Sequence, residues 1–348
     1  MIYFVILSIL FLFSILEGCQ NSSQRKCLFF FSFFLLFFLS AFRFDIGMDY
    51  SAYRELYMDS VTPNEEIKET GFRYIYYFLR NQFISFSCVI FLFSFFTLKY
   101  AFKFIKEDSP FIFFSVLIFF CVGQFYFNSF NAMRQVLAVY IILAKLVPFM
   151  EKRKFLPYLL CVVALSFCLH MSVIVLLPLY FFVCKRMSLF FRLIVLVAFV
   201  SSSSILVLLI YNSPYAMYLT FEHYASDVAL SVYLLFFVAL IIAAAEYLIK
   251  TESIREKILF NLNYYSILSI VLVILFENTP LVLFFTRISY FFTPVQIVLL
   301  PLVVNRLFSK RSKIVVVNIL SVFYVLLCYI SLHSNGVANK LIPYRTIF

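Results

Sequence analysis

The chain is built largely from long, uninterrupted apolar runs, and these restrict its fold more than any other feature. The runs cover residues 1–17, 27–44, 83–104, 111–128, 131–150, 155–183, 189–211, 228–249, 259–276, 281–304 and 313–333. Most match the roughly 20 residues that a helix needs to cross a bilayer core of about 30 Å. Because the runs do not alternate in polarity, they favour helices over the strands of a membrane β-barrel.

Composition supports the same interpretation. Of the 348 residues, 64% are hydrophobic and 13% are charged, which is too little polar surface to cover a water-soluble domain. We therefore predict an all-α, polytopic membrane bundle of about 11 or 12 membrane segments. Residues 1–348 are expected to form a single membrane domain, and no nucleic-acid partner is expected because membrane topology accounts for most of the net charge of +11.

The run 155–183 decides the predicted topology, because it is long for one crossing helix and short for two. If it crosses once, basic residues divide almost evenly between the two sides of the membrane. If it dips across and returns, they favour one side by roughly two to one, as the positive-inside rule requires. We therefore predict a helical hairpin with an outward apex near His170, and 45–80 as the main extracytoplasmic loop.

This topology gathers most basic clusters on the predicted cytoplasmic side. They are Arg25/Lys26, Lys99/Lys103/Lys106, Lys152/Arg153/Lys154, Lys185/Arg186/Arg192, Lys250/Arg255/Lys257 and Arg306/Lys310/Arg311/Lys313.

Five ionisable residues interrupt or border the apolar runs, namely Arg43, Asp49, Arg134, His170 and Arg287. An ionisable side chain in hydrocarbon costs roughly 2.5–3.5 kcal/mol, so a chain that keeps several normally places them in a polar cavity. In the predicted topology all five lie at the extracytoplasmic face. We therefore expect a binding site there.

Arg134 and Arg287 each occur with polar neighbours. Asn128, Asn131 and Gln135 are spaced so that, on a helix, they would share one edge with Arg134; the alternative is an arginine that extends to the interface from a helix end. Arg287 belongs to a polar stripe that also contains Thr286, Ser289, Tyr290, Thr293 and Gln296. The alternative for this stripe is hydrogen bonding between helices. We favour a ligand-facing role for both arginines.

His170 and Asp49 are the candidate bases. An imidazole exchanges protons near neutral pH, whereas a metal site is not expected because His170, His223 and His333 are scattered. Asp49 follows Gly47, which indicates a tight turn, and it could equally be an ordinary loop acid. Tyr50, Tyr53 and Tyr57 follow at helical spacing and predict a short interfacial helix.

Two arginines at a membrane boundary suit a diphosphate that links a lipid to a sugar, because guanidinium groups stay charged and bind phosphate oxygens in pairs. Tyrosines offer flat faces and hydroxyls that suit sugars. The sequence carries no nucleotide-binding motif. We therefore expect neither a nucleotide-sugar donor nor a cofactor.

At these residues the chain resembles the EpsG family of bacterial exopolysaccharide proteins, which is related in function to Wzy-type polymerases. The segments that carry the resemblance are Arg43 to Tyr53 (RFDIGMDYSAY), Glu69 to Phe72, Asn131 to Ala138 (NAMRQVLA), Glu151 to Lys154, Ala164 to Ser172, Arg287 to Phe292, Leu300-Pro301 and Pro343-Tyr344. Met48 departs from the Thr or Ser expected between Gly47 and Asp49.

The resemblance implies a GT-C-like glycosyltransferase of the bacterial inner membrane that joins undecaprenyl-diphosphate-linked repeat units into capsule, exopolysaccharide or O-antigen at the outer face. Implied partners are the lipid-linked glycan, membrane lipid, a flippase and a chain-length regulator. Asp49 or His170 would accept the proton of the acceptor hydroxyl. The substrate-binding candidates are Arg43, Tyr50, Tyr53, Asn131, Arg134, Gln135, Arg287 and Tyr290.

Three other functions stay open at this point. A glycan ligase of similar architecture would transfer a finished polymer to another acceptor. A transporter or flippase would need a polar path through both leaflets, and a membrane acyltransferase would use His170 as its base and need a route for an acyl donor.

Overall fold

The computed structural model describes residues 2–184, 187–201, 205, 207, 208, 211, 212, 216, 229–249, 251–336 and 340–347. Lys185, Arg186, His223 and Lys250 lie outside these residues. In the described chain every named element is helical, and the one β feature is an isolated bridge between Arg43 and Thr346. Eight helices are long and apolar enough to cross a membrane, and three shorter apolar helices accompany them. The predicted all-α, polytopic membrane fold is confirmed.

The chain divides into two compact units. Unit 1 contains Met1–Pro178 and Val304–Phe348, and unit 2 contains Leu179–Val303. The helices of unit 1 are α1 (Ile2–Ile15), η1 (Leu16–Cys19), α2 (Ser22–Ala41), α3 (Tyr50–Met58), α4 (Thr70–Asn81), α5 (Phe86–Asp108), α6 (Ile112–Cys121), η2 (Phe127–Phe130), α7 (Met133–Ile141), η3 (Ile142–Leu146), α8 (Val147–Glu151), α9 (Phe155–Cys168), η4 (Met171–Leu176) and α18 (Lys310–Asn335).

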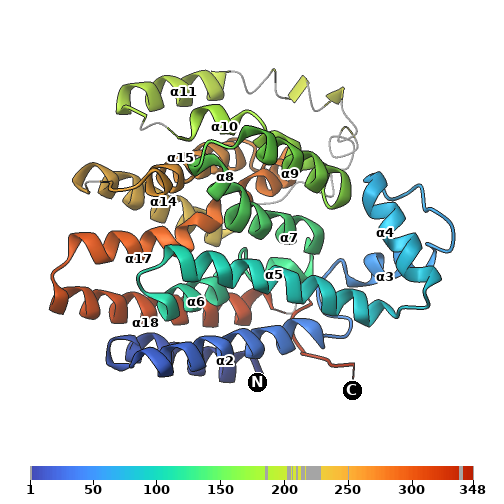
Figure 1. The fold of residues 1–348 in the computed structure, drawn as a ribbon, viewed down its shortest axis with the longest axis horizontal. Helices are drawn as coiled ribbons and strands as arrows, with labels where there is room; N and C mark the ends of the chain where they lie inside the picture. The colour runs from blue at the N-terminus through green and yellow to red at the C-terminus, as the bar shows by residue number, and fades with distance from the viewer. Residues whose placement is uncertain are drawn as a thin grey trace. The chain divides into compact units, whose positions relative to one another are not determined.

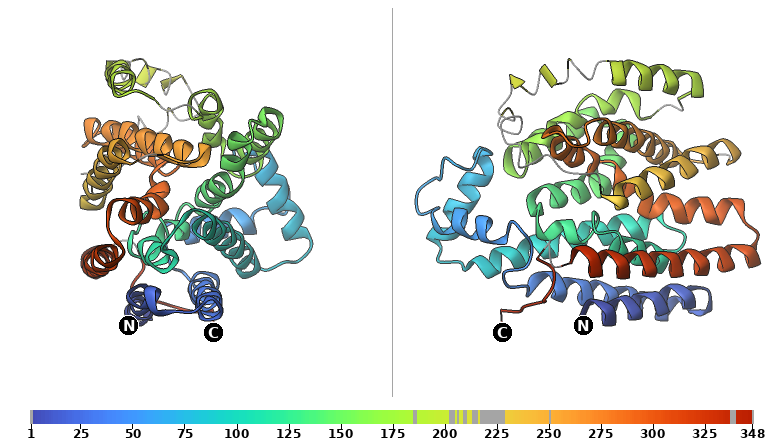
Figure 2. Two further views of the ribbon diagram at one scale, coloured as in Figure 1. Left: turned by 60° about the vertical axis from the view of Figure 1, so that its left-hand side comes forward. Right: turned by 180° about the vertical axis from the view of Figure 1, so that it is seen from behind.

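The long helices of unit 1 lie side by side (Figures 1 and 2). Helix α1 contacts α6 and α18, α2 contacts α5, and α5 contacts α7. Large aromatic side chains fill the space between them; Phe113, Phe114, Phe119 and Phe120 of α6 are at most 1% exposed. Hydrophobic burial of this kind, with side chains packed at crystal-like density, holds the helices together.

The connections of unit 1 gather at two opposite ends. The first, which we call the basic end, consists of residues 16–26, 104–112, 151–155 and 304–313. The second, the site end, consists of residues 42–85, 122–134, 169–172 and 340–347. Helix α5, with its 23 residues, runs from the site end to the basic end over about 34 Å, which is enough to cross a bilayer.

Capping side chains fix where several helices begin. Asn21 and Gln24 form a capping box at the start of α2, with the Gln24 N–H donating to Asn21 Oδ1 at 2.8 Å. Ser85 caps α5 and Ser309 caps α18. In the membrane-spanning stretch from Met133 to Glu151, the π-helical segment η3 precedes Pro148, which lacks the N–H that would continue a regular α-helix.

The run 155–183 turns back within unit 1. Helix α9 has 14 residues, about 21 Å, and ends at Cys168. The chain reverses at Leu169 and His170, so that the Tyr158 hydroxyl donates to the Leu176 carbonyl and Ser166 Oγ donates to the Met171 carbonyl at 3.1 Å. His170 therefore lies at the point of reversal, at the site end.

Residues 340–347 pack against the end of α2 and the loop that follows it. The N–H of Phe44 donates to the Arg345 carbonyl at 3.0 Å, and the N–H of Ile347 donates to the Phe42 carbonyl at 3.1 Å. The Tyr344 hydroxyl donates to the Leu39 carbonyl at 2.8 Å. This segment therefore fixes the path of residues 42–47.

Unit 2 contains α10 (Leu179–Phe182), α11 (Leu189–Ser201), α14 (Leu230–Leu248), α15 (Ile254–Leu275), α16 (Leu281–Ser289), η6 (Thr293–Val295) and most of α17 (Gln296–Leu307). Helix α15 packs against α11, α14 and α16. In the interior of unit 2, Arg192 donates to both Glu246 carboxylate oxygens, at 2.6 and 2.9 Å, and to Asn261 Oδ1 at 3.1 Å. Removing one member of such a buried pair typically costs about 3–5 kcal/mol, so we assign this group to stability.

Candidate functional site

Arg134 is held in a fixed position at the site end of unit 1. It lies in the first turn of α7, and its Nη1 atom is 2.6 Å from Glu69 Oε2. The side chains are 17% and 8% exposed, respectively. The guanidinium carbon lies 4.7 Å from the centre of the Phe72 ring and 5.7 Å from that of Tyr53. A carboxylate and two aromatic rings therefore orient the guanidinium.

Glu69 connects Arg134 to the turn at His170. Its second oxygen, Oε1, accepts a hydrogen bond from the Met171 N–H at 3.3 Å. Burial raises the pKa of the Glu69 carboxyl, but Arg134, His170 and the Met171 N–H together outweigh this effect and hold the pKa below its ordinary value. Glu69 is therefore ionised at neutral pH and acts as the anion that links α7 to the turn.

Gly71 explains how α4 comes close enough to α9 for this connection. A Cβ atom at this position would lie 2.6 Å from Phe167 Cδ1 and 2.9 Å from the Phe167 carbonyl oxygen. Only a glycine allows the two helices to approach this closely.

The His170 ring is oriented by a neighbouring hydroxyl. His170 precedes η4, and its Nδ1 atom lies 2.6 Å from Ser172 Oγ and 3.3 Å from the Ser172 N–H. The hydroxyl contact is the closer of the two. Such a contact fixes the ring plane and determines which ring nitrogen can exchange a proton with a substrate.

Asp49 follows a tight turn that is attached to the start of α7. Gly47 has φ +98°, and a Cβ atom there would lie 2.6 Å from the Phe130 carbonyl oxygen. The next residue, Met48, donates its N–H to Asn131 Oδ1 at 2.7 Å. Asp49 is half-buried, and its carboxylate does not cap α3.

Arg43 contacts the protein on all sides. It is 2% exposed, its Nη1 donates to the Ser40 carbonyl at 2.9 Å, and its guanidinium lies 4.6 Å from the Phe130 ring centre. Burial lowers the pKa of Arg43 to about 10. The side chain therefore joins the end of α2 to the segment before α7.

The predicted polar edge of a single helix around Arg134 is wrong. The run 111–128 does not form one helix, because α6 ends at Cys121; Asn128 belongs to η2, and α7 begins only at Met133. The physical reason is that the Asn128 carbonyl accepts from both Asn131 and Ala132, which forms a tight turn. Gln135 is 1% exposed and Tyr50 is 4% exposed, so neither offers much surface to a ligand.

Arg287 lies in the last turn of α16 in unit 2 and is half-buried, as is Tyr290. The hydroxyls around it bond to the backbone of their own segment: Thr286 to Val282, Ser289 to Thr286 and Thr293 to Ser289. Gln296 Nε2 donates to the Leu235 carbonyl at 3.1 Å. These four side chains therefore serve packing between and within helices, while the ligand-facing roles of Arg287 and Tyr290 stay predictions.

Glu69 is the site residue that sequence reasoning missed. It is one of seven acids in the loop 45–80, and no spacing rule separates it from the others. The available signal was its place at the start of Glu69 to Phe72, one of the segments that carry the family resemblance.

A hollow of about 480 Å³ lies along α3 and the turn that precedes it. It is lined by Phe44, Asp45, Tyr50, Ser51, Arg54, Glu55, Met58 and Asp59. Carboxylates, an arginine and an aromatic ring are the side chains that bind sugar hydroxyls and ring faces.

Comparison with known proteins identifies a family. The model of the EpsG family matches residues 26–346, nearly the whole chain, including every residue of the site described above. No curated protein and no solved structure is detectably similar. Among the described residues, no group of three or more His, Cys, Asp or Glu side chains is arranged to hold a metal ion.

Proposed function

The chain belongs to the EpsG family, a Wzy-like family of polysaccharide polymerases, and on this premise we propose that it joins undecaprenyl-diphosphate-linked oligosaccharide repeat units into a surface polysaccharide. The single observation that carries the proposal is the position of Arg134, whose guanidinium is oriented by Glu69, Phe72 and Tyr53 at the site end of unit 1. A preorganised cation at this place suits the diphosphate of a lipid carrier.

In the proposed reaction an acceptor sugar hydroxyl attacks the anomeric carbon of the donor sugar. The bond between that carbon and the diphosphate oxygen breaks, and undecaprenyl diphosphate leaves with the electron pair. Arg134 stabilises the negative charge that develops on the leaving oxygen. Arg287, which belongs to unit 2, is proposed as a phosphate-binding cation in its own right.

His170 is proposed to take the proton of the acceptor hydroxyl. Nδ1 accepts a hydrogen bond from the Ser172 N–H, so in the neutral ring it is the basic nitrogen, and the proton of the acceptor is proposed to reach it through the Ser172 hydroxyl, whose Oγ lies 2.6 Å away. The hydrogen bond from Met171 to Glu69 supports this choice, because it connects the turn at His170 directly to the partner of Arg134. Asp49 is the alternative base, and the hollow along α3 is proposed to hold sugar residues.

We propose that the protein resides in the bacterial cytoplasmic membrane with the site end outside. The distribution of charge supports this orientation: the basic clusters at Arg25, Lys106, Lys152 to Lys154 and Lys310 to Lys313 all fall at or near the opposite end of unit 1. The carbohydrate polymer would then be built where it is exported.

The test is the length of surface glycan on a gel, in a gene deletion complemented by wild type, Arg134→Ala, His170→Ala, Asp49→Asn or Arg80→Ala. We expect single repeat units from the deletion and from Arg134→Ala, and long polymer from Arg80→Ala, which changes an arginine in the last turn of α4 that lies outside the site. His170→Ala and Asp49→Asn decide between the two bases.

Two outcomes would contradict the proposal. Long chains that stay on the carrier lipid in the deletion would indicate a ligase. Normal polymer from a well-expressed Arg134→Ala protein would remove the arginine from the reaction and favour a transporter.

A further inference from the structure

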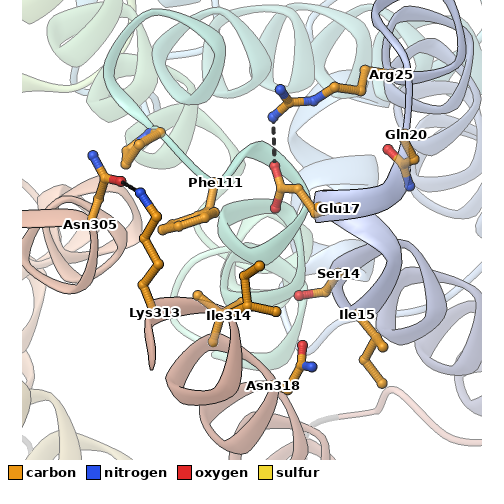
Figure 3. Close-up of a pocket in the computed structure, with 13 residues that line it drawn as sticks. Ser14, Ile15, Glu17, Gln20, Arg25, Phe111, Asn305, Lys313, Ile314 and Asn318 are labelled. Atoms are coloured by element: carbon orange, nitrogen blue, oxygen red, sulfur yellow. Dashed lines mark hydrogen bonds and ion pairs between the residues drawn. The ribbon is translucent and has the colours of Figure 1, made fainter. Parts of the chain in front are cut away.

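A second polar cavity, of about 260 Å³, lies at the basic end of unit 1, away from the proposed active site (Figure 3). The ends of α1 and α5 and the starts of α2, α6 and α18 surround it. Its polar and charged lining residues are Ser14, Glu17, Gln20, Arg25, Asn305, Lys313 and Asn318. At about 30 Å³ per molecule, it has room for on the order of eight waters.

Glu17 is fully engaged within the protein. Its carboxylate accepts hydrogen bonds from the N–H groups of Phe113 and Phe114, at 3.2 Å each, at the start of α6. Arg25 Nη2 lies 3.2 Å from Glu17 Oε1. Because a helix N-terminus and an arginine balance this carboxylate, it presents little net negative charge to the cavity.

Lys313 is the cation that this network does not neutralise. Its Nζ donates to Asn305 Oδ1 at 2.8 Å, a neutral partner, and lies 5.9 Å from the centre of the Phe111 ring. One carboxylate, one arginine and one lysine line the cavity, so its net charge is positive. It therefore attracts an anion that carries about one negative charge.

Several buried polar atoms at the cavity have no hydrogen-bond partner among the described residues. They are both terminal atoms of the Gln20 amide, Arg25 Nε and Asn318 Oδ1. Buried donors and acceptors are rarely left unsatisfied, because each costs about 1–3 kcal/mol. The cavity thus offers donors for an anion and acceptors for hydroxyl groups.

The cavity lies where candidate membrane-spanning helices end and begin: Glu17 is near the end of the first, and Lys313 is near the start of the last. The lining also contains apolar side chains, and one of them, Ile314, is 41% exposed. A ligand with a polar, anionic head and apolar tails would match both surfaces, whereas a soluble ion would use only the polar one.

We propose that this cavity binds the phosphate and hydroxyl groups of an anionic glycerophospholipid such as phosphatidylglycerol. The phosphodiester is bound by Lys313 and Arg25, and the headgroup hydroxyls are bound by Gln20 and Asn318. Such a site would fix the junction of α1, α2, α6 and α18 to the bilayer. The proposal does not depend on the polymerase reaction.

The test is lipid retention by native mass spectrometry of the purified full-length protein, using phosphatidylglycerol and phosphatidylcholine as probes. Lys313→Gln removes the unneutralised charge, and Lys310→Gln, an exposed lysine one turn earlier on α18 that does not line the cavity, is the matched control. We expect Lys313→Gln to weaken the tightest phosphatidylglycerol binding about tenfold or more, because a hydrogen bond to a charged group is lost. Lys310→Gln and phosphatidylcholine binding should be unchanged.

Asn318→Ala gives a second, smaller perturbation, and thermal melting of each variant verifies folding. Inorganic phosphate is added to the protein in phosphatidylcholine nanodiscs to test for a soluble ligand. If it raises the melting temperature as much as phosphatidylglycerol does, and only when Lys313 is present, the ligand is a soluble phosphate. The lipid assignment is then wrong. Equal lipid retention by Lys313→Gln and Lys310→Gln would show that the cavity is only hydrated.

Discussion

Glu69 combines three roles in one side chain at the site. It balances the charge of Arg134, accepts a hydrogen bond from the turn at His170, and directly precedes the close approach of α4 to α9 at Gly71. A glutamine has one acceptor oxygen, so it could accept from Arg134 or from the Met171 N–H but not from both, and it could not balance the arginine. The site therefore requires the carboxylate, with its charge and its two oxygens.

Glu69→Gln should leave Arg134 without an anionic partner in a largely buried place. Losing one partner of a buried pair costs about 3–5 kcal/mol, so we expect a lower melting temperature in addition to short glycans. Glycan ladders and thermal melts of the purified protein measure the two effects. Exposed Glu65→Gln in the same loop is the control, and a Glu69→Gln protein that makes normal polymer would exclude a positioning role for the carboxylate.

The same side chain predicts how stability depends on pH. Its pKa is lower in the folded protein than its ordinary value of 4.5, so the unfolded chain binds the proton more tightly. The stabilisation by Glu69 should therefore be complete above about pH 4.5 and disappear as the pH falls through the lower folded-state pKa. The melting-temperature difference between wild type and Glu69→Gln should shrink as the pH falls below 4.5. A difference that grows below pH 4.5 would contradict this assignment.

At the scale of elements, the contact between α4 and α9 determines whether Glu69 reaches Met171. Gly71→Ala would place a methyl group within 2.6 Å of the Phe167 ring, so α4 must move away from α9. We expect this variant to shorten the polymer strongly and to lower stability by about 1–3 kcal/mol.

Gly123→Ala is the matched control, because a Cβ atom there meets no atom within 4 Å. Glycan length and melting temperature should change only for Gly71→Ala. Equal behaviour of the two variants would show that the approach of α4 to α9 does not matter for the site.

The sequence predicts membrane-crossing elements well and their interruptions poorly. Hydropathy identifies α2, α5 and α18 because each is a continuous apolar run, and tyrosine spacing identifies α3. The end of α6 at Cys121 leaves only a weak signal, because the aromatic side chains of residues 125–127 and 130 continue the apolar run, although Gly123, Gln124 and Asn128 interrupt it. Because this interruption is not predicted, Asn128 and Asn131 are placed on one helix with Arg134, whereas α7 begins only at Met133.

The sequence likewise identifies some site residues and misses others. A charge in an apolar run makes Arg134 conspicuous, because burying it requires a polar environment. Its partner Glu69 is 65 residues away in a polar loop, and only tertiary packing brings them together. Long-range pairing of this kind has no periodic signature in one sequence.

At the scale of the whole molecule, the proposed orientation predicts which end of unit 1 a reagent outside the cell can reach. In a cysteine-free protein, a membrane-impermeant maleimide should label Asp59→Cys in intact cells and label Arg311→Cys only after permeabilisation. Both native side chains are exposed, one at the site end and one at the basic end. Labelling of Arg311→Cys in intact cells would reverse the proposed orientation.

The hydrogen bonds between residues 341–347 and the region around α2 also set a time at which the site can form. Tyr3 and Tyr344 each take part in a contact that spans more than 300 residues of chain, 338 and 305 respectively. At translation speeds of about 5–20 residues per second, the Arg43–Gly47 turn waits between about 15 and 60 s for these partners. The nascent chain therefore holds an unfinished site, which can form only after the distant segment has been synthesised and docked.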